Sequence, residues 1–287
     1  MIVVKFNGGL GNQLFQYAFG RALQLRYKDS YAIDVEEFRR SYGHVPRHYS
    51  LGNFNLPDDV KLLSVKKSRS LLAFKVFHKV NSNLNVKLAS FFDVYWWRNP
   101  VYKDLGMNDT KGRKCYFYGY WQSEKYFYDY RDTIKKELKV KTPIVEESRP
   151  YAALIEKTNA VCLHIRRGDF VKEGMIICDR DYYQRGIDYM VQHTANPRFF
   201  IFTNDNEWVR ENVKLPADAV FVDVADPDYE VLRLMYMCKH FIISNSSFSW
   251  WGQYLADHEE KIVVAPKSWS VVWPNEKSIY LDTWVIL

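Results

Sequence analysis

The sequence lacks the features that mark a metalloprotein, a disulfide-stabilised domain or a membrane-spanning chain. Its 287 residues include only four cysteines, Cys115, Cys162, Cys178 and Cys238, with no C-x-x-C spacing and no histidine at metal-like intervals. Two of them, Cys162 and Cys238, stand in apolar patterns and are expected to be buried thiols. No apolar run reaches the roughly 18 residues that span a bilayer, and no signal peptide precedes the first apolar run. We therefore expect a cytoplasmic protein without a metal or another cofactor.

Acidic residues are missing between Val60 and Phe92, although 26% of the whole chain is charged. The net charge of +6 is concentrated in this stretch, so the rest of the chain carries about −1 and no nucleic-acid partner is expected. The stretch is either a solvated helical face or a peripheral contact with the inner face of a membrane through residues 61–87. Its cations are Lys61, Lys66, Lys67, Arg69, Lys75, Lys79 and Lys87.

Aromatic residues are abundant, at 17% of the chain with nine Trp and 21 Tyr. An aromatic core accounts for such a composition. Carbohydrate sites also use flat apolar faces with a polar tip, so a sugar-binding groove is the alternative. Composition alone leaves both interpretations open.

The first half of the chain opens as an α/β unit. The apolar run Ile2–Phe6 predicts a strand, residues 7–12 a glycine turn, and the apolar spacing from Leu14 to Leu25 a helix. The segment 141–150, with two X-Pro pairs, is expected to be a linker. We further expect strands at 32–35 and 116–120, a helix at 126–138, and short helices and loops from 42 to 100.

The second half alternates strands and helices every roughly 20 to 30 residues, which predicts a parallel sheet with right-handed crossovers. Asp226 is expected to cap one of its helices, and Pro227 to occupy the first turn of that helix. The predicted fold is α/β, of two Rossmann-like domains (1–145 and 146–287) that face each other across a cleft. The second domain has expected strands at 161–165, 199–202, 220–224, 241–243 and, as the last one, 261–264, and helices at 181–192, 207–212, from 227 onward and at 249–256.

Polar clusters follow three of these predicted strands. They are His164–Asp169, Thr203–Asp205 and Ser244–Ser247. Because ligands bind beyond the carboxyl ends of strands in open parallel sheets, we expect all three clusters on one rim. This convergence is the main sign of a functional site that the residues themselves give.

Two of these clusters, 164–169 and 244–247, have both a structural and a functional interpretation. Arg166 is suited to phosphate oxygens through its planar charged fork, and strand alternation places His164 on the same face. The alternative is an ion pair of Arg166 or Arg167 with Asp169. The Ser/Asn run 244–247 offers N–H groups and a helix dipole to an anion, or it simply caps the helix that follows.

The glycine turn allows two interpretations. Gly9-x-Gly11 after a strand, with Asp34 about twenty residues later, is typical of a dinucleotide-binding fingerprint. The third glycine of that fingerprint falls at Leu14, however, and no Gly-Lys-Ser follows. A close approach of the backbone to another part of the molecule explains the glycines equally well.

Three ordered motifs together resemble the α-1,2-fucosyltransferases of glycosyltransferase family eleven. They are the segments 7–17 (NGGLGNQLFQY), 164–170 (HIRRGDF) and 244–252 (SNSSFSWWG), and the similarity runs from near residue 4 to near residue 266. The resemblance implies a GT-B fold, inverting transfer of fucose from GDP-fucose to the 2-hydroxyl of a terminal β-galactoside such as lactose, and no metal.

The resemblance also implies roles for individual residues. Arg166 is similar to the arginine that grips the donor's β-phosphate, and Gly11 and Asn12 to the loop at the reaction centre. Asp169 is the nearest carboxylate of the motif, either a general base or a partner of the arginines. The implied GDP-fucose contacts further include His164, Asn204, Asp205, Asn245, Ser246, Ser247 and Phe248.

Other functions stay open at the level of sequence. Asp223, Asp226 and Asp228 form an acidic cluster that could hold a metal, although Asp226 before Pro227 is better explained as a helix cap. A GDP-sugar or glycan binding protein without catalysis is a second alternative. An NAD-linked oxidoreductase that uses the Gly9-x-Gly11 turn is a third.

Overall fold

The chain forms two compact units, residues 1–137 and residues 138–287. The division follows Glu137, whereas the sequence analysis places the domain boundary after residue 145. Among the described residues, no helix has the length and apolarity to cross a bilayer. The computed structural model describes residues 1–39, 47–63, 92–97, 102–107, 113–224 and 227–287.

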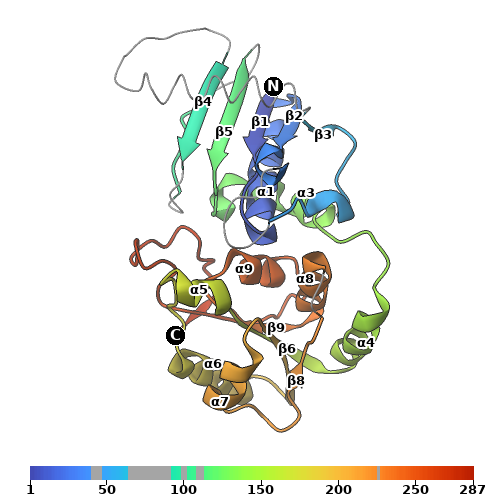
Figure 1. The fold of residues 1–287 in the computed structure, drawn as a ribbon, viewed down its shortest axis with the longest axis vertical. Helices are drawn as coiled ribbons and strands as arrows, with labels where there is room; N and C mark the ends of the chain where they lie inside the picture. The colour runs from blue at the N-terminus through green and yellow to red at the C-terminus, as the bar shows by residue number, and fades with distance from the viewer. Residues whose placement is uncertain (40–46, 64–91, 98–101, 108–112, 225–226) are drawn as a thin grey trace. The chain divides into compact units, whose positions relative to one another are not determined.

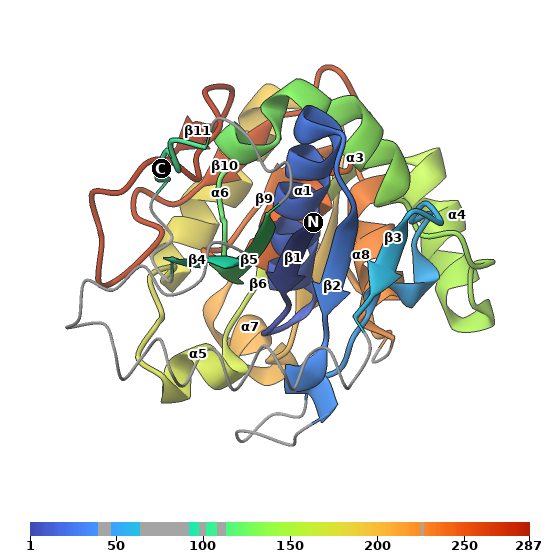
Figure 2. The same ribbon diagram turned by 90° about the horizontal axis from the view of Figure 1, so that it is seen from above.

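Unit 1 contains a five-stranded parallel sheet of order β3-β2-β1-β5-β4 (Figure 1). Its central strand β1 carries Ile2, Val3 and Val4, all with 0% exposure, because both faces of a parallel sheet are covered. Helix α1 packs against β1, as Figure 2 shows. The elements are β1 Ile2–Lys5, α1 Leu10–Tyr27, β2 Tyr31–Asp34, η1 Glu36–Arg39, η2 Leu51–Asn53, β3 Val60–Leu62, β4 Phe92–Trp97, β5 Lys114–Gly119, η3 Glu124–Tyr126, η4 Tyr128–Tyr130 and α3 Arg131–Glu137.

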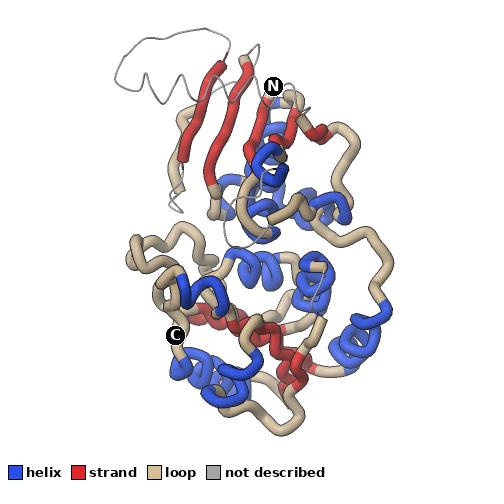
Figure 3. Tube along the Cα trace, in the orientation of Figure 1, coloured by secondary structure: helices blue, strands red, loops and turns tan. Residues whose placement is uncertain are grey.

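Unit 2 contains a six-stranded parallel sheet of order β11-β10-β9-β6-β7-β8. Helices α8 and α9 lie on one side of this sheet and α6 and α7 on the other (Figure 3). The elements are η5 Glu146–Ser148, α4 Arg149–Lys157, β6 Asn159–Ile165, α5 Gly168–Lys172, α6 Arg180–His193, β7 Pro197–Thr203, α7 Asn206–Asn212, β8 Val220–Phe221, α8 Asp228–Met237, β9 His240–Ile242, α9 Ser247–Tyr254, β10 Val263–Ala265 and β11 Val285–Ile286.

Several sequence expectations need correction. The expected linker 141–150 contains the start of α4, because a proline is tolerated in the first turn of a helix. The segment expected to be a helix, 126–138, holds the end of η3, then η4 and α3. The buried Tyr126 ends η3 and the buried Phe127 lies between η3 and η4, and here packing overrides helical spacing. β10 is not the last strand, because β11 pairs with it. Strands β3 and β4 both fall in the segment 42–100, which is expected from the sequence to hold only helices and loops.

Helix α8 begins differently from the expectation. It starts at Asp228, and its N-cap is Pro227, which makes no side-chain cap bond. Asp226, the expected cap, lies outside the described residues, as does most of the basic stretch 61–87.

Candidate functional site

The strand order of unit 2 reverses between β6 and β9. In open parallel sheets, ligands bind beyond the carboxyl ends of the strands at such a reversal. β6 ends at Ile165 and β9 at Ile242, so the two predicted clusters 164–169 and 244–247 follow adjacent strands. The structure therefore places them together at the edge of the sheet where a ligand is expected.

His164 joins these two clusters directly. Its Nδ1 lies 3.1 Å from Ser244 Oγ and also contacts Ser249 Oγ, and the two hydroxyls are 3.1 Å apart. Burial of the ring, together with the positive charge of Arg166, lowers the pKa of His164 to about 3. The imidazole is therefore neutral near pH 7, so it can form hydrogen bonds but adds no positive charge.

The third cluster is held to the first by Arg167. Its backbone N–H donates to Asn204 Oδ1 at 2.9 Å, and its Nε donates to Asp205 Oδ2 at 3.1 Å. Its guanidinium carbon also lies 3.9 Å from the ring centroid of Trp208. Arg167 therefore pairs with Asp205, whereas the side chain of Asp169, the other predicted partner, lies outside the described part of the chain. All three predicted clusters consequently form one connected group.

Asn204 and Asp205 are engaged in holding this group together. Asp205 Oδ1 accepts from the backbone N–H of Trp208 at 3.2 Å and so caps α7. A Cβ added to Gly168 would lie 2.2 Å from Asn204 Nδ2, and Gly168 has a φ of +38°. The close approach of these two turns therefore requires glycine at position 168.

Arg166 occupies a different environment from Arg167. It is half-buried, and its guanidinium carbon lies 5.4 Å from the ring centroid of Phe170. The backbone of Asp169 lies in the first turn of α5. Arg166 thus follows β6, one of the two central strands of the sheet, at the point where the strand order reverses.

The serine turn serves as a helix cap. Ser246 Oγ accepts from the backbone N–H of Phe248 at 3.3 Å, and Ser247 opens α9. The side-chain amide of the buried Asn245 donates to the carbonyl oxygens of Met175 at 3.1 Å and Trp269 at 3.4 Å. Asn245 thus ties two loops to the turn. The ring centroid of Phe248 lies 5.9 Å from that of His164, so the turn and the histidine lie close together.

In unit 1 the strand order reverses between β1 and β5, and the glycine turn follows β1. Gly8 has a φ of +75°, and Gly9 is the N-cap of α1. Gln16 is buried and spans the reversal: its Nε2 donates to Asn7 Oδ1 at 2.8 Å and to the carbonyl oxygen of Gly119 at 3.1 Å. The side chain of Asn12, in the first turn of α1, accepts a hydrogen bond from Gln122 Nε2 at 2.7 Å.

The acidic residue that a dinucleotide-binding turn requires, here Asp34, is not accessible to a ligand. Asp34 is 1% exposed, its Oδ2 accepts from the hydroxyl of Tyr116 at 2.8 Å, and its Oδ1 accepts from the backbone N–H of Glu36 at 3.0 Å. A carboxylate so enclosed is not presented to a ribose. The geometry therefore disfavours the NAD-linked alternative.

Two residues of these clusters escaped the sequence reasoning. Ser249 lies three residues after the capping Ser246, and helical spacing would have turned it toward the strand end, but a serine in a predicted helix carries no specific signal. Gln122 lies in a loop after β5, with no pattern around it. Trp250 and Trp251 of the same motif are fully buried and belong to the core.

The comparisons with known proteins place the chain in a family. The family model described as glycosyl transferase family 11 matches residues 1–287. An α-1,2-colitosyltransferase of Escherichia coli is 30% identical over 94% of this chain and 92% of its own length. Galactoside α-(1,2)-fucosyltransferase 2 of Mus musculus is 26% identical over 56% of this chain and 48% of its own length. The chain therefore belongs to glycosyl transferase family 11.

Solved structures with similar folds include two fucosyltransferases. Fucosyltransferase NodZ from Bradyrhizobium has a TM-score of 0.52 at 15% identity, covering 89% of this chain and 93% of its own. POFUT1 in complex with GDP-fucose has a TM-score of 0.51 at 12% identity, covering 91% and 97%. Together with the two parallel sheets, these likenesses confirm the predicted α/β fold of the GT-B class.

A metal centre finds no support in the described part of the chain. No group of three or more His, Cys, Asp or Glu side chains is gathered there in a way that could hold a metal ion. Of the acidic cluster considered above, Asp223 is exposed, and Asp228 lies in the first turn of α8.

Proposed function

We propose that this chain transfers L-fucose from GDP-fucose to the 2-hydroxyl of a terminal β-galactoside and forms an α-1,2 linkage in glycan or surface polysaccharide synthesis. The observation that carries the proposal is the connected group at the β6/β9 reversal, with Arg166 beside the neutral His164 and the serine turn. It stands in a chain whose relatives are named for α-1,2 transfer, one of them to galactosides.

In this proposal the second domain (146–287) binds the donor and the first (1–145) serves the acceptor. Arg166 grips the β-phosphate, because a guanidinium matches phosphate oxygens with two parallel hydrogen bonds. The N-terminus of α9, with Ser246 and Ser247, stabilises the negative charge of the same phosphate. The remaining donor contacts are assigned to His164, Asn204, Asp205, Asn245 and Phe248, with Gly11 and Asn12 at the reaction centre.

The reaction follows from these positions. The acceptor hydroxyl attacks C1 of fucose while GDP leaves from the opposite face, through a transition state with oxocarbenium character. Negative charge grows on the departing β-phosphate, so Arg166 stabilises the transition state more than the bound substrate. His164, with its low pKa, orients the donor as a neutral hydrogen-bonding group. Asp169 is the carboxylate assigned to receive the acceptor's proton.

A second candidate is colitose as the transferred sugar, because a relative over nearly the whole chain is named an α-1,2-colitosyltransferase. Colitose is fucose without its 3-hydroxyl, so the two donors differ by one hydrogen-bonding group. A site built to bind that hydroxyl rejects the deoxy sugar strongly, whereas an apolar site does not.

The test is a donor and acceptor screen. GDP-fucose and GDP-colitose are compared by kcat/KM with lactose as acceptor, and the product linkage is determined by NMR. An α-1,2-fucosylated product supports the proposal, and a preference for GDP-colitose moves it to the second candidate. Calorimetry adds a binding control: GDP should bind far more tightly than UDP or NADH. Binding of GDP-fucose with no turnover on any β-galactoside would leave only a binding protein.

A further inference from the structure

Three buried polar atoms of unit 2 form a closed triangle. They are His164 Nδ1, Ser244 Oγ and Ser249 Oγ, and each contacts the other two. Within the described part of the chain, neither serine hydroxyl has any other hydrogen-bond partner. Both serines are 0% exposed, so the hydroxyls are not open to solvent. The hydrogens of both hydroxyls must therefore be placed inside the triangle.

A count of these hydrogens determines which nitrogen of the His164 ring carries its own. Each hydroxyl donates one hydrogen, and a neutral imidazole has one N–H and one accepting nitrogen. If Nδ1 accepts, Ser249 can donate to Nδ1 and Ser244 can donate to Ser249, so both hydrogens are paired. If Nδ1 carried a hydrogen, the hydroxyls would have only each other as acceptors, and one buried O–H would stay unpaired. The cost of that unpaired donor favours the first arrangement by about tenfold or more.

The hydrogen of the neutral ring is therefore on Nε2. This nitrogen has no hydrogen-bond partner among the residues that the structure describes. His164 is the penultimate residue of β6, two positions before Arg166, at the edge of the sheet where a ligand is expected. An Nε2–H group attracts an oxygen acceptor such as a phosphate, whereas an unprotonated Nε2 would repel it.

We propose that Ser244 and Ser249 are positioning residues that hold His164 with its hydrogen on Nε2, so that the ring donates to a phosphate oxygen of the sugar donor. This inference rests on the proposed function, in which the second domain binds GDP-fucose. The two serines act redundantly, because either hydroxyl alone is close enough to donate to Nδ1.

The first test measures the tautomer of His164 in the free protein. Long-range proton–nitrogen NMR spectra distinguish a ring nitrogen that carries a hydrogen from one that does not. The signals of His164 among the seven histidines are identified by their loss in His164→Asn. We expect a hydrogen on Nε2 and none on Nδ1 at neutral pH, and a hydrogen on Nδ1 would overturn the inference. No nucleotide or sugar is present, so this result does not depend on the proposed function.

Substitution of the serines tests their positioning role. Ser244→Ala and Ser249→Ala each keep one hydroxyl for Nδ1, so each should retain the tautomer and the affinity for GDP. The double variant leaves Nδ1 without a donor. It should show a measurable share of the tautomer with the hydrogen on Nδ1 and bind GDP about tenfold more weakly, because the ring is no longer fixed. An unchanged tautomer in the double variant would contradict the role of the serines.

The matched control for these variants is Ser148→Ala. Ser148 is another fully buried serine of unit 2, and its hydroxyl has no partner in the described ranges of the chain. Its substitution should change neither the His164 signals nor the affinity for GDP. Thermal melts show whether each serine variant is folded.

Two substitutions of His164 test the donated hydrogen itself. Gln can place an amide N–H near the position of Nε2, whereas the shorter Asn cannot. We expect His164→Asn to weaken GDP binding about tenfold, as measured by calorimetry, and His164→Gln to recover part of the loss. Equal affinities of the two variants would overturn the contact with phosphate. A wild type that binds GDP but transfers fucose to no galactoside would refute the proposed function and leave this inference standing.

Discussion

Arg166 and Arg167 are neighbours in the chain, but their side chains lie in different environments. Arg167 is bonded to Asp205 and lies over the ring of Trp208, so its guanidinium joins two turns of unit 2. Arg166 stands at the strand reversal, with its guanidinium carbon 5.4 Å from the ring centroid of Phe170. If the proposed function holds, substitution of Arg166 should impair donor binding and substitution of Arg167 should impair folding.

We expect Arg166→Ala to lower kcat/KM at least about 100-fold without unfolding the protein, because a group that stabilises transition-state charge is lost. Arg166→Lys should recover little, since an ammonium cannot reproduce the fork. Arg167→Ala is the matched variant and should lower Tm, because it removes the contacts to Asp205 and Trp208. Kinetics and thermal melts on the three variants check this, and a folded Arg166→Ala protein with normal activity would refute the role.

The low pKa of His164 predicts a pH dependence of stability. In the unfolded chain the imidazole takes up a proton near pH 6.5, whereas in the folded protein its pKa is about 3. The unfolded state therefore binds more protons as the pH falls below 6.5, and stability is lost in that direction. Between pH 7 and pH 5 this group should cost about 2 kcal/mol of the free energy of unfolding. Urea titrations of the wild type and His164→Asn at both pH values measure the difference, and parallel losses in the two proteins would contradict the assignment.

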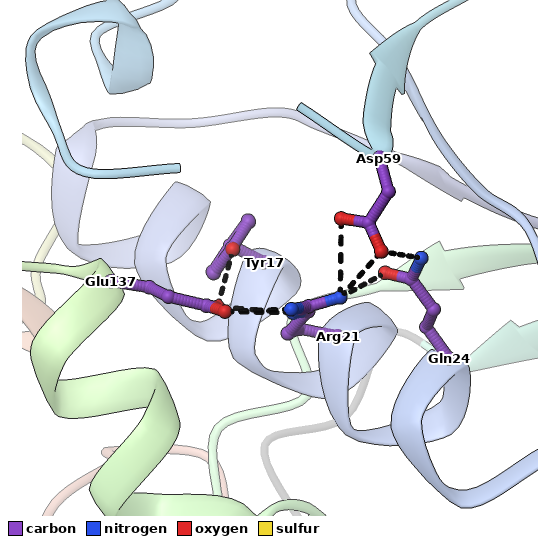
Figure 4. Close-up of polar contacts among 5 residues, drawn as sticks. All are labelled: Tyr17, Arg21, Gln24, Asp59 and Glu137. Carbon is purple, nitrogen blue, oxygen red and sulfur yellow. Dashed lines mark hydrogen bonds and ion pairs between the residues drawn. The ribbon is translucent and has the colours of Figure 1, made fainter. Parts of the chain in front are cut away.

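At the scale of elements, helix α1 is fixed by a buried polar network (Figure 4). Arg21 Nη2 lies 2.8 Å from Glu137 Oε1 of α3, and the hydroxyl of Tyr17 donates to Glu137 Oε2 at 2.6 Å. Burial, followed by the charge of Glu137, raises the pKa of Tyr17 far above its usual value. Arg21 also reaches Gln24 and Asp59, so one cation joins α1, α3 and the residues before β3.

We expect Glu137→Gln to lower the free energy of unfolding by about 3 kcal/mol, because it leaves the cation of Arg21 buried beside a neutral group. Tyr17→Phe removes one hydrogen bond and should cost about 1 kcal/mol. Asp59→Asn is the control: the carboxylate is 59% exposed, so its loss should cost less than about 1 kcal/mol. Urea unfolding of the three variants gives the order, and equal effects of Glu137→Gln and Asp59→Asn would contradict the buried pair.

Helices and strands are predicted correctly from the sequence where the local apolar pattern agrees with the packing in the folded chain. β1, α1 and most strands of unit 2 are found where apolar periodicity places them, because these segments are buried along their length. β11 escapes prediction because two residues carry no periodicity.

The residues of the candidate site also fall into those that local sequence patterns predict and those that they do not. His164 and Ser246 follow from strand ends and capping rules, and the structure brings their clusters together. The contact of Gln122 with Asn12 joins segments 110 positions apart, and no local pattern in the sequence reveals it.

For the whole molecule, we expect transfer to proceed without a divalent metal, because Arg166 supplies the positive charge that a metal would otherwise provide. Activity should therefore survive excess EDTA. A loss that Mn²⁺ or Mg²⁺ restores would contradict this and direct attention to Asp223 and Asp228. The measurement is the initial rate with GDP-fucose and lactose before and after chelation.

Positive charge is concentrated in the basic stretch 61–87, and this concentration predicts how the protein responds to membranes. It has seven cations and no acidic residue, and each cation near an anionic surface contributes roughly 1 kcal/mol. We expect the protein to sediment with anionic vesicles and to be released at high salt, because the attraction is screened within about 10 Å at 0.1 M. Replacing Lys66, Lys67 and Arg69 by Gln should weaken partitioning about 100-fold, as expected for about 3 kcal/mol.

The matched control for this prediction replaces three exposed lysines elsewhere, Lys136, Lys141 and Lys172, by Gln. It removes the same charge from the whole molecule, so only the place of the charge differs between the two triple variants. If both variants lose binding equally, net charge and not the basic stretch attracts the protein to the vesicle. If the wild type stays in the supernatant with anionic vesicles at low salt, the stretch is a solvated surface. Retained binding in the control, with loss in the first variant, assigns the membrane contact to residues 61–87.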